Sequence, residues 1–284
     1  MKKKILVTGG AGFIGSHLCE KLAQNHNNMV FSLDNYSTGS IDNHVKNVEY
    51  IVGSTVDIDS IISFTPEFIY HLGEYSRVEQ SFEDINEVWK SNKEGIFSIL
   101  EFTRKTGAKL IYAGSSTKFG DGGLGRSQSP YAWTKATNTE LVVNYGDWFG
   151  ISFAITYFYN VYGEREISTG KYATLIGLYV NQRLNNQKLT VVSPGTQRRN
   201  FTHINDIING LILIGENGYG DDFGIGCEDS YTVLEVAEMF EGDITMLPER
   251  KGNRMFADVV IKKTVELGWT SKESLKDYIK KSRN

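Results

Sequence analysis

The sequence predicts an α/β fold in which a doubly wound parallel sheet is followed by a smaller mixed α/β domain. Two observations lead to this prediction. The chain opens with a short apolar run that ends in a cluster of glycines and continues directly into a helical pattern. Strand patterns and helical patterns then alternate regularly, which is typical of a parallel sheet with helices on both faces. We expect a first domain over residues 1–162 and a smaller one over residues 163–284, with some later segments returning to the sheet.

Composition and charge exclude several classes of protein. The chain has 284 residues, of which 40% are hydrophobic and 23% charged, as in globular proteins that bury a core without disulfides. A net charge of −4 without a basic block gives no reason to expect nucleic acid. The apolar stretches are too short for a membrane span or a signal peptide. Cys19 and Cys227 show no metal-ligand spacing, so we expect no metal. Since neither a membrane span nor a signal peptide is indicated, we expect no membrane partner and a cytoplasmic location.

The opening glycines form the first motif that carries chemistry. They follow the apolar run at residues 5–7 and can be read in two registers, which share Gly12 and Gly15 and begin at Gly9 or at Gly10. A strand, a glycine turn and a helix N-terminus together make a cradle for a pyrophosphate, because glycines allow a tight turn and a close approach of the backbone. A glycine-rich turn alone would be weak evidence. Its place between a strand and an amphipathic helix predicts a dinucleotide site.

The second strand, expected at residues 29–34, ends in a carboxylate. Asp34 lies about 20 residues beyond the glycines, where such folds place an acid on the ribose hydroxyls of the adenosine half. A carboxylate there would repel a 2′-phosphate, so Asp34 favours NAD over NADP. The alternative is a turn aspartate that closes a strand. The turn at residues 35–39 could reach the phosphate side of the cofactor.

The next elements continue the alternation. We expect strands at residues 48–53, 67–72, 108–113 and 152–158, and a long helix at about 85–106 that is closed by Gly107. Asp57 and Ile58 lie at a plausible adenine edge, although Asp57 could equally cap a helix. Ligands of such sheets bind beyond the carboxyl ends of the strands, so the segment after residue 113 is the expected reaction site.

That segment contains a hydroxyl cluster and, beyond it, a tyrosine and a lysine. Tyr131 and Lys135 are four residues apart on a predicted helix and therefore share a face. A nearby ammonium stabilises a phenolate, which a tyrosine general base requires, and Ser115 could bridge the phenol and a substrate oxygen. A tyrosine and a lysine at this spacing are common on helix surfaces. Together with the nucleotide motif and the strand-end serines, they predict a catalytic pair.

Taken together, these motifs resemble the extended short-chain dehydrogenase/reductase family, the nucleotide-sugar epimerases and dehydratases. The resemblance runs from the Thr8 start to Trp269, and it includes the pieces at residues 71–72, 160–163 and 195–201. It implies a Rossmann fold, NAD as cofactor, a nucleotide-diphosphate sugar as substrate and a homodimer formed through a four-helix bundle. The bundle helices would be about 85–106 and 131–148. Residues that could line the bundle, or equally the core, are Phe97, Leu100, Leu141 and Tyr145.

The resemblance also implies a role for each matching residue. Tyr131 is the base, Lys135 holds the nicotinamide ribose and tunes Tyr131, and Ser115 binds the sugar hydroxyl. Asn92 orders the lysine, partly through water. The implied cofactor-binding residues are Gly9, Gly12, Phe13, Ile14, Gly15, Asp34, Asn35, Ser37, Thr38, Gly39, Asp57, Ile58, Leu72, Gly73, Asn92, Tyr131, Lys135 and Tyr159. The implied substrate-binding residues are Ser76, Ser115, Ser116, Asn160, Arg199 and Arg250.

For four residues the sequence itself also allows another interpretation. Arg199 and Arg250 would clamp the diphosphate, because a guanidinium fork suits phosphate, but a single exposed arginine is usually a solvated charge. Tyr159 belongs to an aromatic run at residues 157–159 that in isolation is more often core. His203 precedes a helix predicted from Ile204 and is expected to be structural rather than a base.

Within the family, the residues after the sugar-binding hydroxyl separate the reactions. Dehydratases carry an Asp–Glu pair there, whereas this chain has Ser116 and Thr117, which cannot supply a carboxyl acid and base for the loss of water. The expected reaction is therefore 4-epimerisation. Tyr131 takes the proton of the sugar 4-hydroxyl, C4 is oxidised to a ketone, and hydride returns to the opposite face of the sugar. The alternative is a nucleotide-sugar dehydrogenase or reductase, and a 4,6-dehydratase is disfavoured.

The chain departs from the family pattern in three places. The segment at residues 121–130, which normally helps to roof the active site, is short and rich in glycine. Glu74 and Arg77 replace small residues close to the expected pocket. Arg77 could meet a sugar carboxylate, as in a hexuronic acid, although a surface charge explains it equally well. Ser116 lies next to Ser115 and competes with it for the sugar-binding role.

Overall fold

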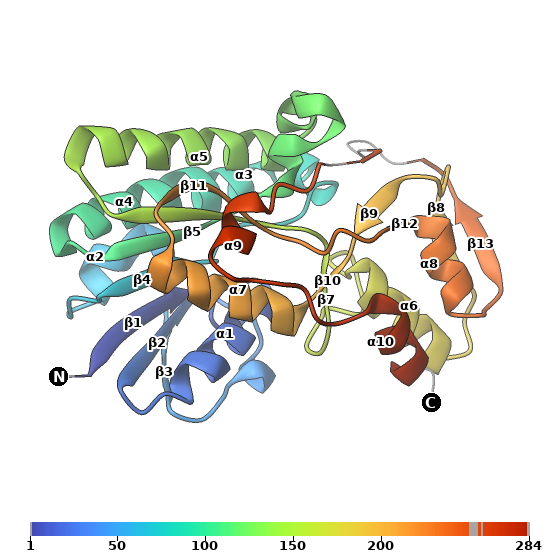
Figure 1. Ribbon diagram of the computed structural model, residues 1–284, viewed down its shortest axis with the longest axis horizontal. Coiled ribbons are helices and arrows are strands. Elements are labelled where there is room, and N and C mark those ends of the chain that lie inside the picture. Colours follow the sequence, from blue (N-terminus) through green and yellow to red (C-terminus); the bar gives the residue numbers. More distant parts are fainter. Residues whose placement is uncertain (1, 250–254, 257, 283–284) are drawn as a thin grey trace.

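A seven-stranded parallel sheet forms the larger layer of the molecule (Figure 1). The computed structural model describes residues 2–249, 255–256 and 258–282. The strand order is β11-β6-β5-β4-β1-β2-β3, and it reverses between β1 and β4, as in a doubly wound sheet. The bounds are β1 Lys3–Thr8, β2 Asn28–Asp34, β3 Val48–Val52, β4 Phe68–His71, β5 Lys109–Ser115, β6 Phe153–Phe158 and β11 Gly220–Ile225. The predicted fold class is confirmed.

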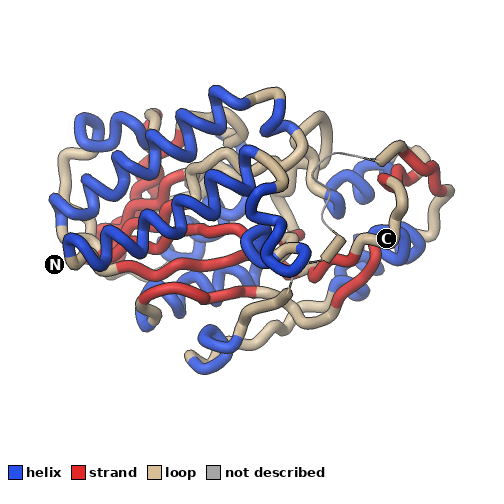
Figure 2. The backbone as a smooth tube through the Cα atoms, turned by 90° about the horizontal axis from the view of Figure 1, so that it is seen from above, coloured by secondary structure: helices blue, strands red, loops and turns tan. Residues whose placement is uncertain are grey.

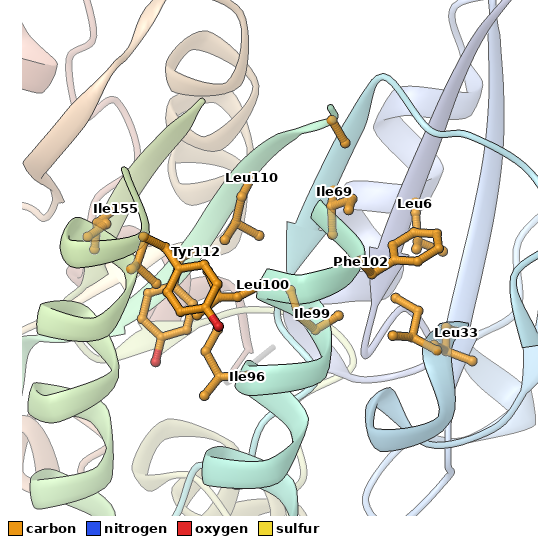
Figure 3. Close-up of a cluster of buried hydrophobic side chains, with 14 of the residues drawn as sticks. Leu6, Leu33, Ile69, Ile96, Ile99, Leu100, Phe102, Leu110, Tyr112 and Ile155 are labelled. Atoms are coloured by element: carbon orange, nitrogen blue, oxygen red, sulfur yellow. The ribbon is translucent and has the colours of Figure 1, made fainter. Parts of the chain in front are cut away.

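Helices cover both faces of this sheet (Figures 1 and 2). On one face, α4 and α5 pack on inward side chains of the strands, and Figure 3 shows Ile96, Ile99 and Leu100 of α4 among them. On the other face lie α1 and α7. Alternate residues of β1 serve the two sides, since Leu6 belongs to the first cluster and Ile5 to the second. The bounds are α1 Phe13–Ala23, α2 Ile58–Ile61, α3 Ile85–Val88, α4 Gly95–Thr106, α5 Pro130–Phe149 and α7 Ile204–Asn217.

The smaller part of the chain lies beyond the carboxyl ends of the strands and has a hydrophobic cluster of its own. Tyr179 of α6 and Leu189 of β8 are fully buried there. The bounds are β7 Val161–Tyr162, α6 Leu175–Leu184, β8 Leu189–Val192, β9 Arg198–Asn200, β10 Thr202–His203, β12 Ser230–Thr232, α8 Val233–Met239, β13 Ile244–Leu247 and α10 Leu275–Ser282. The helix α9 Lys262–Glu266 packs on β11 of the larger layer. Because α7 and β11 pack with the sheet, residues 204–225 belong structurally to the larger layer.

The long helix expected at residues 85–106 is interrupted. It consists of α3, a π-helical turn at Trp89–Glu94 and α4, and Gly107 ends it in the left-handed conformation (φ 71°). Two of the side chains considered for a dimer face are core residues instead: Leu100 is fully buried and Tyr145 is 6% exposed. Phe97 of α4 is 55% exposed, and Leu141 of α5 packs partly against the core. The homodimer stays a prediction.

In the part of the chain that the structure describes, no helix is long and apolar enough to cross a bilayer.

Candidate active site

The glycine loop after β1 is built for close backbone contact. Gly9 has a φ of 73°, and its carbonyl oxygen accepts a hydrogen bond from the Gly12 N–H at 3.1 Å. A Cβ at Gly15 would lie 2.0 Å from the Gly9 oxygen, so only glycine fits where the helix crosses the loop. These contacts favour the register that begins at Gly9. The α1 helix then begins at Phe13 without a side-chain cap, which leaves its first N–H groups for an anion. The loop therefore fits a pyrophosphate.

Asp34 stands beside this loop at the end of β2. One carboxylate oxygen accepts the Ala11 N–H at 2.9 Å, and the other accepts the Tyr36 N–H at 2.8 Å. The aspartate therefore closes its turn, as the alternative interpretation had it. Each oxygen keeps a further acceptor site for a ribose hydroxyl, so the two roles are compatible. The neighbouring residues Asn35, Ser37 and Thr38 are exposed at the rim of the loop, and Gly39 packs against Asp34.

Two residues assigned to the adenine edge differ in burial. Asp57 is exposed at the start of α2 and makes no side-chain cap. Ile58 is fully buried in the core, so only its main chain could face a ligand, and its place at the adenine edge stays a prediction. Gly73, after β4, packs directly on the glycine loop: a Cβ there would lie 2.9 Å from the Gly9 nitrogen. Leu72 is half-buried next to it.

The predicted catalytic residues come together at the end of β5. The Tyr131 hydroxyl donates to the Ser115 Oγ at 3.1 Å, and both side chains are buried. Lys135, one turn farther along α5, donates to the Ala113 carbonyl oxygen at 2.5 Å and to the Glu74 carboxylate. The helix is placed by its first turn, in which Ser129 caps the Ala132 N–H at 3.1 Å. This geometry selects Ser115 over Ser116 as the partner of Tyr131.

Ser115 and Tyr131 line a cavity of about 560 Å³ that lies between the sheet and the smaller part of the chain. Such a volume suits a ligand of drug or nucleotide size. Predicted residues that line it are Phe13, Ile14, Ser76, Ser115, Ser116, Tyr131, Asn160 and Arg199. The cavity also includes Arg77 and the shortened segment, through Gly125 and Gln128. The cavity therefore lies beyond the carboxyl ends of the strands, where the reaction site was expected.

Tyr159 was expected at the cofactor, but its side chain does not line the cavity. Its side chain is 1% exposed within the core cluster, and its hydroxyl accepts the Val260 N–H at 2.9 Å. The residue that lines the cavity is Phe158. Side chains alternate between the two sides of an extended segment, so Tyr157 and Tyr159 share the core side and Phe158 faces the other way. Sequence reasoning missed Phe158, although this alternation could have indicated it.

Asn92 lies behind the site rather than in it. It is fully buried and is not a polar residue on an exposed helix face. Its side-chain Oδ1 accepts the Tyr75 N–H at 2.7 Å, and its main-chain carbonyl oxygen accepts a hydrogen bond from the Asn138 side-chain amide at 2.7 Å. Asn138 in turn donates to Glu74 at 3.2 Å. Asn92 is therefore linked to Lys135 through protein side chains, and sequence reasoning missed Asn138.

The expected diphosphate clamp pairs Arg199 with Arg250. Arg199 lies on β9 and lines the cavity, and its Nη1 donates to the Arg198 carbonyl oxygen at 2.8 Å. Arg250 lies outside the described residues, so the clamp stays a prediction. His203 is the N-cap of α7, where its Nδ1 accepts the Asn205 N–H, which agrees with a structural role.

Glu166 is a half-buried carboxyl that is hydrogen-bonded to Thr174 of the cavity wall, and it predicts a pH-dependent stability. It accepts hydrogen bonds from Thr174 and from the N–H groups of Gly163 and Gly177, but burial raises its pKa from 4.5 to about 7. As pH rises from 4.5 to 7, the unfolded chain loses this proton before the folded one does. The free energy of unfolding should therefore fall, by on the order of 3 kcal/mol at most.

Urea unfolding between pH 4.5 and pH 8 measures this change in stability. Glu166→Gln should flatten the decrease, because an amide does not titrate in this range. The exposed Glu87 provides a matched control, and Glu87→Gln should keep the wild-type slope. An unchanged slope in Glu166→Gln would contradict the prediction.

Known proteins resemble this chain over most of its length. Residues 5–226 match the sequence model of the NAD dependent epimerase/dehydratase family. UDP-glucuronic acid decarboxylase 6 of Arabidopsis thaliana is 30% identical to the chain, and the match covers 96% of this chain and 86% of that protein.

Two solved structures share the whole architecture. UDP-glucose 4-epimerase of Thermotoga maritima is 26% identical with a TM-score of 0.92, covering 99% of this chain and 97% of that one. UDP-glucuronic acid 4-epimerase of Bacillus cereus, solved with UDP-glucuronic acid and NAD, is 25% identical with a TM-score of 0.87, covering 99% and 98%. The chain belongs to the NAD-dependent epimerase/dehydratase family of extended short-chain dehydrogenases/reductases, and its cofactor is NAD.

Proposed function

We propose that the protein is an NAD-dependent 4-epimerase of a nucleotide-diphosphate sugar. The observation that carries the proposal is the hydrogen bond from the Tyr131 hydroxyl to Ser115 at the wall of the cavity, with Lys135 one turn away. This arrangement can take a proton from a sugar hydroxyl and return it. The glycine loop and Asp34 lie on the same edge of the sheet, where they would hold the cofactor.

Each residue has a defined task in this mechanism. When bound, NAD supplies the oxidation of C4 and its later reduction. Ser115 orients the 4-hydroxyl by hydrogen bonding, and Tyr131 takes its proton as C4 becomes a ketone. The Lys135 ammonium favours the phenolate form of Tyr131. After the keto sugar has turned in the cavity, the Tyr131 hydroxyl returns the proton to the oxygen on C4.

The hydroxyl cluster supports epimerisation over dehydration. Ser116 and Thr117 are both buried beside Ser115, and the Thr117 hydroxyl donates to the Ser115 Oγ at 2.9 Å. Loss of water needs an acid and a base at the sugar, and carboxyl groups supply them in the dehydratases. Hydroxyl groups at these two positions are too weakly acidic for that work near neutral pH.

A second candidate function is the decarboxylation of a nucleotide-linked hexuronic acid, which a specific residue favours. Arg77 lines the cavity, where its Nε donates to the Tyr172 carbonyl oxygen at 3.0 Å and its Nη1 to the Ser76 carbonyl oxygen at 3.1 Å. Both of these partners are neutral, so the guanidinium keeps its charge for an anion in the cavity. A sugar carboxylate would suit it. The relative from Arabidopsis thaliana is named for such a reaction.

Incubation with a panel of UDP-, GDP-, dTDP- and CDP-linked sugars, hexuronic acids included, tests both functions. The products are followed by NMR, together with free NADH and carbon dioxide. The proposal predicts inversion at C4 without net NADH and without carbon dioxide. Release of carbon dioxide would establish the second candidate, and stoichiometric NADH would show a dehydrogenase. A 4-keto-6-deoxy product would show dehydration and overturn the proposal.

A further inference from the structure

Glu74 is a buried carboxylate in direct contact with the active-site lysine. It follows β4, and its side chain is 2% exposed. One oxygen accepts from Lys135 and from the Tyr112 hydroxyl, the latter at 3.0 Å. The other accepts from the Asn138 amide at 3.2 Å and faces His71 Nε2 at 3.4 Å. Four neighbouring side chains thus hold the carboxylate in one orientation.

The environment keeps this carboxylate ionised. Burial acts to raise the pKa of Glu74, but the Lys135 ammonium and the His71 contact outweigh burial, and the pKa is lowered. The charge is therefore present throughout the neutral range. A buried charge is tolerated only when it is paired and hydrogen-bonded, and both conditions hold here.

The pairing limits what Lys135 can do. An ammonium group has three N–H donors, of which one goes to the Ala113 carbonyl oxygen and one to Glu74. One donor is left to reach a ribose hydroxyl of the cofactor. The positive charge that Tyr131 experiences is also reduced, because a carboxylate touches the ammonium.

We propose that Glu74 is a positioning residue, which orients Lys135 and offsets its charge, and thereby sets the pH at which Tyr131 gives up its proton. The inference rests on the proposed function in that Tyr131 serves as the base. Ser115, Tyr131 and Lys135 provide the reacting groups, and Glu74 acts on them through Lys135.

Other charged and titratable groups surround this pair, and they stay in place when Glu74 is changed. Lys93, in the π-helical turn, donates to Asn138 at 2.8 Å. His71 on β4 shares a hydrogen bond with Thr8 through its Nδ1 at 2.7 Å, and the Tyr112 hydroxyl comes from β5. Arg77 lies at the cavity wall on the Tyr131 side. Removal of the Glu74 charge therefore leaves the cations Lys135, Lys93 and Arg77 around the Tyr131 phenol.

The test is a titration of the Tyr131 phenolate on the NAD-loaded protein, read as the ultraviolet absorbance difference between each protein and its own Tyr131→Phe variant. Glu74→Gln should lower the midpoint by about one pH unit, because the offsetting charge is gone. The acidic limb of the turnover profile should move by the same amount. An unchanged midpoint in folded Glu74→Gln would overturn the proposal.

Two further variants separate this role from general packing. Glu74→Asp keeps the charge and should return the midpoint toward the wild-type value. Asp221 forms a similar partly exposed pair with Lys118 at 2.9 Å and bonds the Tyr157 hydroxyl, so Asp221→Asn is the matched control. It should lower stability without moving the midpoint. A shift as large as that of Glu74→Gln would show a general effect and overturn the proposal.

A second measurement covers the case in which Glu74→Gln does not fold. With carbon-13 on the glutamate carboxyls, the Glu74 resonance, assigned by its loss in Glu74→Asp, should move in step with the Tyr131 titration. The movement should be missing in Tyr131→Phe, and a resonance that ignores Tyr131 would overturn the inference. Neither this readout nor the absorbance titration needs turnover. Failure of the proposed function would show in the sugar panel and would leave both of these readouts unchanged.

Discussion

Replacing Tyr131 with phenylalanine is expected to lower turnover by about 10²- to 10⁴-fold while NAD stays bound, because the change removes the group that takes the substrate proton. The phenyl ring keeps the packing of the buried side chain and loses only the hydroxyl that donates to Ser115. The cofactor cradle, made by the glycine loop and Asp34, does not depend on that hydroxyl. Turnover of the substrate found in the panel and the NAD content of the purified variant are the measurements.

Tyr145 provides the matched control on the same helix. Its side chain is also buried, and its hydroxyl donates to Glu101 at 3.0 Å, on the side away from the cavity. Tyr145→Phe should cost about 1 kcal/mol of stability and leave turnover within a few-fold of the wild type. Full activity in Tyr131→Phe would remove this tyrosine as the base. An equal loss in both variants would point to damage of helix α5.

The sheet was predictable from local pattern. Short apolar runs with glycine or proline between them marked six of its parallel strands to within about two residues. The edge strand β11 was not indicated, because its residues 220–222 are polar and lie where little packs on them. The π-helical turn at Trp89–Glu94 was not indicated either, because the helical periodicity is read over several turns and does not resolve one turn with i→i+5 hydrogen bonds.

The site was predictable where a motif fixes the backbone. Gly9, Gly15 and Tyr131 occupy the places that their spacing required, because those places follow from strand ends and helix turns. The side chains of Tyr159 and Ile58 lie in the core, which the sequence did not indicate, because a motif marks a segment and does not say which side chain faces the ligand. Burial against the opposite layer decides that, and it depends on residues far away in the sequence.

Glu74 shows a different limit. Its position after β4 suggested a pocket residue, and its pairing with Lys135 could not be read from a separation of 61 residues. The contact arises because β4 and β5 are adjacent and α5 crosses them, which places the end of β4 under the lysine. Tertiary packing, and not a local pattern, therefore brings Glu74 to Lys135.

Gly15→Ala is expected to have the largest effect on the cofactor itself. The added Cβ would lie 2.0 Å from the Gly9 oxygen, 2.7 Å from the Gly9 carbonyl carbon and 2.8 Å from the Gly10 Cα. All three are main-chain atoms, so no side-chain rotation relieves the overlap, and the loop must move away from α1. We expect a loss of about 1–3 kcal/mol in the free energy of unfolding and a fall in NAD affinity of about 10- to 100-fold. Urea unfolding and calorimetric titration of NAD measure the two quantities.

A variant at a second glycine distinguishes an effect on the glycine loop from a general loss of stability. A Cβ at Gly215 of α7 would also lie 2.0 Å from a neighbour, but that neighbour is the hydroxyl at the far end of the Tyr70 side chain. Gly215→Ala should therefore lower stability and leave NAD affinity unchanged. Equal losses of affinity in the two variants would show that NAD binding follows overall stability. A normal affinity in Gly15→Ala would mean that the cofactor does not need the close approach of helix and loop. The predicted difference between the two variants follows from their contacts, since only at Gly15 does the overlap fall on the backbone that would hold the pyrophosphate.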